Sequence, residues 1–187
     1  RCGVIWEDKG ICDTTIIVVS IIPITPCNGI TVNSILKEST CNNNDGEIIL
    51  TASGALNYKY QWSPNVSSSH SASNIPAGIY TITVSDLNNP SCSEVVSYAV
   101  TNKNGPKAES IQIENATCNA SNGKVTLSPS TLTYTWNDGF VGSVRNDLKS
   151  GIYFVTIENS NIPDCKNYLV IKVNSTSTLT VFANTEN

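Results

Sequence analysis

The sequence has few of the residues that enzymes use for chemistry. Its 187 residues include one histidine and no methionine, and only 14% are charged, against roughly 25% in an average soluble protein. The histidine, His70, lies in a run of serines, where we expect a solvated loop rather than a catalytic triad. The absence of methionine indicates a mature piece or a fragment of a longer chain. We therefore expect that the protein is not an enzyme.

Basic character and long apolar segments are also lacking. The formal net charge is −4 at pH 7, whereas nucleic acids and anionic membranes select faces rich in lysine and arginine. The longest apolar run, residues 16–24, is about half the length that a membrane-spanning helix needs. Its isoleucines and valines favour a buried strand. We expect neither a nucleic-acid partner nor insertion into a membrane.

An internal repeat is the strongest pattern that the sequence contains. Four landmarks occur twice in the same order, with an offset that falls from 77 to 73 residues. Such self-similarity indicates two copies of one structural module. The landmarks are Thr-Cys-Asn at 40–42 and 117–119, Tyr-x-Trp at 60–62 and 134–136, Gly-Ile-Tyr at 78–80 and 151–153, and Cys92 with Cys165.

Each copy alternates apolar and polar residues with the period of a half-buried β-strand. Tyr80, Ile82 and Val84 share one face of a strand, and Tyr153, Val155 and Ile157 are their counterparts in the second copy. Turns rich in Asn, Gly, Ser and Pro separate such segments, as in an antiparallel sandwich. The fold class predicted is all-β, with tandem antiparallel Ig-like β-sandwich modules stapled by disulfides.

The repeat also predicts the domain organisation and the centre of each core. Residues 27–103 form the first module, and residues 104–187 form the second module with a C-terminal strand. Residues 1–26 form the C-terminal hairpin of a partial Ig-like domain or a strand-exchange segment. Trp62 and Trp136 recur beside the strand alternation, which favours packing in the core over a sugar-stacking surface.

Seven cysteines indicate a disulfide framework and therefore an extracellular location. The sequence contains neither a Cys-x-x-Cys pair nor a histidine near the cysteines, so it does not favour a zinc site. Because equivalent positions imply equivalent bonds, each copy is predicted to close its own disulfide, and a turn-rich hairpin suggests another at the N-terminus. The predicted pairs are Cys41 with Cys92, Cys118 with Cys165, and Cys2 with Cys12, which leaves Cys27 unassigned.

Two further kinds of site remain open alternatives. The oxygen-rich loops at Asp45 and Asp86 could hold calcium, but the second copy has Asn122 and Asn159 there, and turn chemistry explains both loops more simply. We expect no cofactor, with calcium as the alternative. The aromatic residues Trp6, Tyr58 and Tyr98 are candidate stacking platforms for a sugar.

The repeated motifs resemble those of the SprB-repeat family, which occurs in long surface adhesins of gliding Bacteroidota. The resemblance covers residues 41–100 and 118–173, although the glycine pair usual before Tyr-x-Trp appears in the first copy only as Ser53-Gly54-Ala55. It implies a secreted protein whose β-sandwich modules are strung into filaments that touch surfaces or polysaccharide. By the same resemblance, Thr14 fits an O-glycosylation acceptor.

These observations favour an extracellular structural and adhesive repeat in a cell-surface fibre, such as a gliding or attachment adhesin. The expected partners are neighbouring repeats of the same chain or other copies in a filament, together with surface polysaccharide. The alternative function is a carbohydrate-binding module of a secreted protein.

Overall fold

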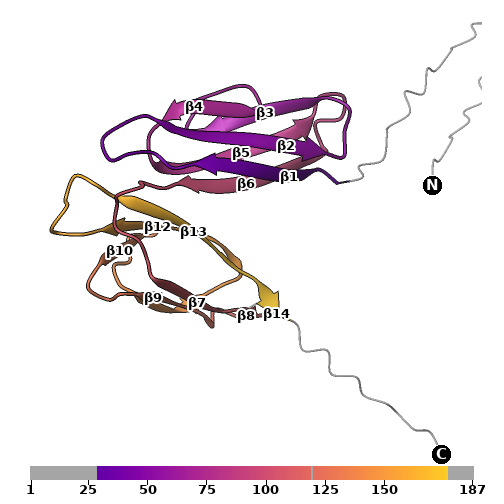
Figure 1. Ribbon diagram of the computed structural model, residues 1–187. Coiled ribbons are helices and arrows are strands. Elements are labelled where there is room, and N and C mark those ends of the chain that lie inside the picture. The colour runs from indigo at the N-terminus through magenta and orange to yellow at the C-terminus, as the bar shows by residue number, and fades with distance from the viewer. Residues whose placement is uncertain (1–28, 119, 177–187) are drawn as a thin grey trace, which may run out of the picture.

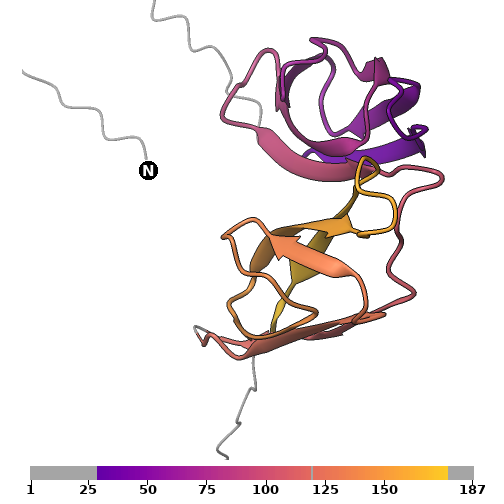
Figure 2. The same cartoon turned by 90° about the vertical axis from the view of Figure 1, so that its left-hand side faces the viewer.

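The computed structural model describes residues 29–118 and 120–176, and all regular elements in these ranges are β-strands. The strands form two modules that lie one above the other in two perpendicular views (Figures 1 and 2). Strands β1 to β6 belong to the first module and β7 to β14 to the second. The predicted all-β fold of tandem antiparallel sandwiches is confirmed.

Two three-stranded antiparallel sheets make up the first module. One sheet has the order β1-β2-β4 and the other has the order β3-β5-β6. The long hairpin of β5 and β6 pairs Gly78 with Val100 at one end and Ser85 with Ser93 at the other. The bounds are β1 (Thr31–Lys37), β2 (Gly46–Ser53), β3 (Tyr58–Ser63), β4 (Ser71–Ile75), β5 (Gly78–Asp86) and β6 (Ser93–Val100).

The second module repeats this arrangement with one addition. Its two antiparallel sheets have the orders β11-β9-β7 and β10-β12-β13, and a short parallel pair, β14 with β8, lies beside them. The bounds are β7 (Ser110–Glu114), β8 (Ala116–Thr117), β9 (Gly123–Ser128), β10 (Thr133–Trp136), β11 (Val144–Leu148), β12 (Gly151–Glu158), β13 (Asn167–Val173) and β14 (Ser175–Thr176).

Each module encloses its own hydrophobic core, formed by the residues that the alternation pointed inward. Tyr80, Ile82 and Val84 are at most 2% exposed, and Val155 and Ile157 are buried in the same way. The two tryptophans are also buried, which confirms their predicted place in the core. Each indole satisfies its N–H on a backbone carbonyl, since Trp62 Nε1 donates to Ser69 O at 2.9 Å and Trp136 Nε1 to Gly142 O at 3.0 Å.

Several features named from the sequence lie outside the described residues. They are the hairpin at residues 1–26, the apolar run at 16–24, Cys2, Cys12, Cys27, Trp6, Thr14 and the C-terminal residues 177–187. In the part of the chain that is described, no helix has the length and apolar character needed to span a membrane.

Candidate functional site at the module junction

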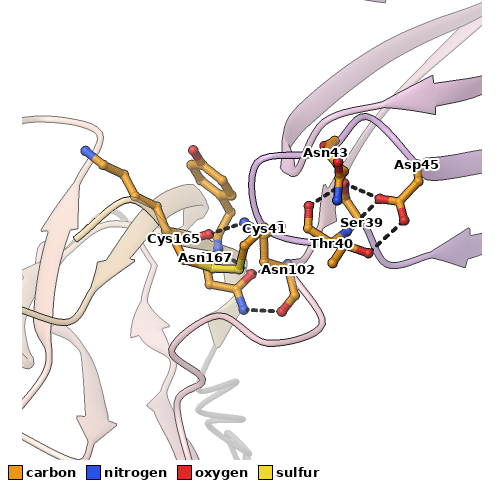
Figure 3. Close-up of a disulfide and its surroundings, with 10 residues drawn as sticks. Ser39, Thr40, Cys41, Asn43, Asp45, Asn102, Cys165 and Asn167 are labelled. Atoms are coloured by element: carbon orange, nitrogen blue, oxygen red, sulfur yellow. Dashed lines mark hydrogen bonds between the residues drawn. A yellow bond between two sulfur atoms is a disulfide. The ribbon is translucent and has the colours of Figure 1, made fainter. Parts of the chain in front are cut away.

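A disulfide between Cys41 and Cys165 joins the two modules (Figure 3). Cys41 lies in the loop between β1 and β2, and Cys165 lies in the loop between β12 and β13. Their Cα atoms are 5.3 Å apart although 124 residues separate them in sequence. The bond therefore connects one end of the first sandwich to the facing end of the second.

The predicted bonds within each module, Cys41 with Cys92 and Cys118 with Cys165, are wrong. Cys92 is itself disulfide-bonded, while Cys118 has a free and exposed thiol. The reason lies in the β5–β6 hairpin, because Cys92 adjoins its Ser85–Ser93 end. The Cys41 loop lies at the other end, where Gly46 approaches Val100. Strand β6 separates these ends by about 25 Å, whereas a disulfide needs Cα atoms within about 7 Å.

Two buried asparagines hold the junction beside the disulfide. Asn102, just after β6, and Asn167, the first residue of β13, are 7% and 2% exposed. The backbone N–H of Asn102 donates to Asn167 Oδ1 at 2.9 Å, and Asn167 Nδ2 donates to the Asn102 carbonyl at 3.2 Å. Asn102 Nδ2 also donates to the carbonyl of Lys166 at 2.6 Å. Since unpaired buried polar groups are costly, these bonds specify how the two modules meet.

An ion pair connects the first module to the linker that follows it. Lys107 Nζ lies 2.7 Å from Glu38 Oε1, which also accepts a hydrogen bond from Thr101 Oγ1 at 2.9 Å. The bond from Lys107, followed by that from Thr101, lowers the pKa of Glu38 below its ordinary value. Both charged side chains are about half exposed, so the pair contributes little free energy and mainly orients the linker.

The loop that presents Cys41 is braced by Asp45. Its Oδ1 accepts from the Thr40 N–H at 2.6 Å and from Ser39 Oγ at 3.0 Å, and its Oδ2 accepts from Thr40 Oγ1 at 2.7 Å. The backbone bond from Thr40 is the main reason that the pKa of Asp45 falls to about 2. Figure 3 shows Asp45 on the side of the loop away from the disulfide. The carboxylate thus fixes the loop from which the cysteine projects.

The oxygen-rich loops proposed as alternative calcium sites have this kind of local bonding. Asp86 Oδ1 accepts from the Asn88 N–H at 2.8 Å, and Asn159 Oδ1 accepts from the Asn161 N–H at 2.9 Å. These are the side-chain turns that Asn and Asp commonly form. Across residues 29–118 and 120–176, no group of three or more His, Cys, Asp or Glu residues could hold a metal ion.

A polar pocket of about 530 Å³ opens at the junction, with walls from both modules. The first module contributes the tip of the Cys41 loop and the turn between β4 and β5, and the second contributes the β12–β13 loop. The lining residues are Asn42, Asn43, Asn44, Pro76, Ala77, Asn102, Pro163, Asp164, Lys166 and Tyr168.

Tyr58 and Tyr98, two of the candidate sugar-stacking rings, and His70 do not line the junction pocket. Tyr58 and Tyr98 are half-buried and pack against the first core, and the Tyr58 hydroxyl is engaged by the backbone N–H and carbonyl of Ala55, each at 2.9 Å. His70 is exposed, as expected for a solvated loop, and its ring lies 6.4 Å from that of Tyr60.

A buried arginine in the second module was not singled out from the sequence. Arg145 is 7% exposed and forms ion pairs with Asp138 and Asp147 at 2.8 and 2.7 Å. Its guanidinium also lies over the rings of Trp136 and Phe140. With both carboxylates and both rings supplied by its own module, Arg145 is a structural residue of that sandwich.

The junction asparagines were also missed, for a physical reason. Asparagine is abundant throughout this chain, and neither Asn102 nor Asn167 belongs to a motif or a periodic pattern. The cysteines were the usable signal: Cys165 is the equivalent of Cys92, so the observed bond joins the same two positions of the repeat that were predicted, but takes one from each copy.

Comparison with known proteins supports the resemblance found in the motifs. Residues 33–67 match the family model of the SprB repeat, which points to a cell-surface or extracellular protein. No curated protein matches the chain. Among solved structures, the chain is similar to the crystal structure of the S-layer protein SbsC domains 4 and 5. The identity is 16%, the match covers 78% of this chain and 96% of that chain, and the TM-score is 0.28.

Proposed function

We propose that this chain, which carries an SprB repeat at residues 33–67, is a structural and adhesive unit of an extracellular cell-surface fibre. Its two sandwiches act as one stiff spacer. The observation that supports this role best is the disulfide between Cys41 and Cys165, because it connects two modules that each have a complete core. A bond in that position contributes nothing inside either core, but it restricts bending between them.

Three kinds of contact restrain the junction together. The disulfide provides a covalent tether, the bonds between Asn102 and Asn167 fix the approach of β6 to β13, and the Glu38–Lys107 pair orients the linker. Modules joined only by a flexible linker would reorient freely. A spacer that holds a binding surface away from a cell needs the stiffer arrangement.

The same disulfide suits a chain that is pulled from its ends. Force that enters through the first module can pass from Cys41 directly to Cys165, which bypasses the residues between them. Such bonds persist in oxidising surroundings, in keeping with a secreted protein of Bacteroidota type. We take the role to be mechanical, without catalysis or a cofactor. The partners are neighbouring repeats or other copies in a filament, with surface polysaccharide as the adhesive target.

Single-molecule stretching tests the mechanical role. The full chain is held at its ends and extended in oxidising buffer and again after reduction. Because the bond bypasses 124 residues, the reduced chain should reach a contour length greater by at least about 400 Å, at roughly 3.3 Å per residue. Equal contour lengths in the two conditions would contradict the proposal.

A matched variant separates the junction bond from reduction in general. Cys118→Ser removes a thiol that forms no disulfide in this structure, so its oxidised and reduced lengths should differ as in the parent. The double variant Cys41→Ser, Cys165→Ser should lose only part of that difference, because Cys92 keeps its own disulfide. A double variant that keeps the full difference would show that another bond carries the load.

A further inference from the structure

Cys118 occupies the same place in the second module as Cys41 does in the first. The two residues are related by the repeat offset of 77, and each is preceded by Thr and followed by Asn. Cys41 is bonded to the neighbouring module, whereas the Cys118 thiol is free and exposed. The structure therefore contains an occupied and an unoccupied version of one cysteine position.

The loop around Cys118 is built like the loop around Cys41. Asn122 Oδ1 accepts from the Thr117 N–H at 2.9 Å, as Asp45 accepts from the Thr40 N–H at 2.6 Å. The free cysteine is thus presented by a loop with the same internal bracing as the bonded one.

The chain also leaves both modules along the same path. In the first module, Asn102 follows β6 and forms a parallel bridge with Ser39. In the second module, Ser175 follows β13 and pairs in parallel with Ala116. Ser175 is the repeat equivalent of Asn102, and Ala116 is that of Ser39. In the first module this path leads on to the junction. In the second module it brings the Ser175 hydroxyl to 3.5 Å from Cys118 Sγ.

A pocket at Cys118 corresponds to one half of the junction pocket. It has a volume of about 240 Å³, and all of its lining residues have counterparts at the junction. Four of these counterparts line the first module's half of the junction pocket, and the fifth is the bonded cysteine itself. Cys118, Ala120, Lys149, Ser150 and Ser175 correspond in order to Cys41, Asn43, Pro76, Ala77 and Asn102.

Exposure differs between the two copies of this surface. Residues 77–79 are half-buried, whereas their equivalents, residues 150–152, are exposed. Ile152, the counterpart of Ile79, is 45% exposed. An exposed isoleucine beside a pocket and a free thiol forms a surface that a neighbour can cover.

We propose that this surface is the docking site for a further β-sandwich module of the same type, placed after Thr176 as the second module is placed after Lys103. A cysteine equivalent to Cys165 in that module forms a disulfide with Cys118. This inference rests on the proposed function and names the partner of the second module: stapling from each module to the next continues along the fibre.

The bond forms by exchange with an oxidised small-molecule disulfide, such as glutathione disulfide. The Cys118 thiolate attacks one sulfur of the reagent, which releases one thiol and leaves a mixed disulfide. The incoming module's thiolate then displaces the second reagent thiol. Two protein thiols are oxidised to one disulfide, and the reagent disulfide is reduced to two thiols, which take up the two protons.

Duplication of the second module within the full chain tests the proposal. A copy of residues 104–176 is inserted between Thr176 and Ser177, which preserves the register of the repeat. The inserted copy carries Cys118→Ser, so that one Cys118 remains, and Ile162→Val, which marks the peptide with its Cys165 by mass. After refolding with glutathione disulfide, peptide mapping should join Cys118 to the marked peptide, and iodoacetamide labelling of Cys118 should be lost.

Results that overturn the docking site can be told apart from results that count against the proposed function. A Cys118 that is still labelled while the inserted copy is folded, or one that is bonded to Cys118 of a second molecule, overturns the docking site. Hydrogen exchange of the marked peptide reports whether the inserted β12 has folded. The Cys41–Cys165 bond is mapped in the same sample. If that bond is present while Cys118 stays free, this inference fails and the proposed function stands, whereas its absence counts against the proposed function itself.

A second insert covers the case in which the duplicated module does not fold. In this second insert, a copy of residues 28–103 that carries Cys41→Ser takes the place of the copy of residues 104–176. Cys92 of that copy occupies the position of Cys165 in the repeat. Cys118 should then be joined to the inserted Cys92. As the matched control, Cys92→Ser in the insert should restore labelling of Cys118. A Cys118 that stays labelled with this insert as well overturns the proposal.

Discussion

Asp45 and Asn122 brace the two cysteine-bearing loops with the same hydrogen bond but with different charge. Each accepts from the N–H of the threonine that precedes the cysteine, Thr40 or Thr117. Because the Asn122 side-chain amide accepts the same hydrogen bond, the geometry of the cysteine-bearing loop does not require a carboxylate. The carboxylate adds charge-assisted bonds from Thr40 and Ser39, which are stronger than neutral ones and make the first loop sensitive to acid.

We predict that Asp45→Asn changes how stability depends on pH. The pKa of Asp45 is about 2 in the folded protein against an ordinary value of 3.8. A depressed pKa gives a contribution that is present above the ordinary value and is lost as the pH falls through about 2. Urea unfolding of the parent and the variant should therefore give midpoints that differ most at pH 5 and converge between about pH 4 and pH 2.

Asp45→Ala is the comparison for this prediction. Alanine removes every acceptor from Thr40, so this variant should be less stable than Asp45→Asn at neutral pH. A difference between the parent and Asp45→Asn that stays constant from pH 5 to pH 2 would show that the charge of Asp45 is not responsible.

At the scale of the strands, Gly46 and Gly123 begin the central strands β2 and β9 at points where neighbouring strands approach closely. A Cβ on Gly46 would lie 2.7 Å from Val100 Cγ1 and 2.8 Å from the Ile75 carbonyl oxygen. A Cβ on Gly123 would lie 2.8 Å from Val173 Cγ1 and 3.0 Å from the Leu148 carbonyl oxygen. The glycine that recurs after each cysteine motif therefore permits the close approach of three strands.

Gly46→Ala should destabilise the first module by about 1–3 kcal/mol, because backbone and core must shift to admit the methyl group. The control is Gly78→Ala, whose Cβ would meet only the Tyr80 ring, at 3.7 Å, and which should leave stability unchanged or slightly raised. Chemical denaturation of both variants measures the effect. Equal stability of Gly46→Ala and the parent would mean that this end of β2 adapts more easily than the contacts indicate.

Most of the strand architecture could be predicted from the sequence because it depends on local alternation. Tyr80, Ile82 and Val84 point inward for the same reason in any antiparallel sandwich, and the tryptophans are large enough to require the core. The contacts between modules have no such local signature. Asn102 is buried where it bonds to Asn167 of the other module, and that pairing arises from tertiary structure.

At the scale of the whole molecule, the cysteine error follows from the symmetry of a repeat. Equivalent bonds can form within each copy or from each copy to the next, and sequence equivalence alone does not distinguish them. The distinction is geometric, since the Cys41 loop and the β5–β6 turn lie at opposite ends of a sandwich. In tandem stacking, the end with Cys41 faces the β12–β13 turn that carries Cys165 (Figures 1 and 3).

The bond between modules should also make the two cores unfold together. It closes a loop of 124 residues, for which the chain-entropy model gives a stabilisation of up to about 5 kcal/mol. Because the loop spans both cores, neither module can gain the full entropy of its unfolded chain while the bond is intact. The double variant Cys41→Ser, Cys165→Ser should therefore melt at a lower temperature and in two separate calorimetric transitions, one for each core.

Cys118→Ser should melt like the parent, since that thiol is unpaired in this chain. A double variant that melts in one transition at the parent's temperature would show that Asn102, Asn167 and the linker couple the modules without the bond.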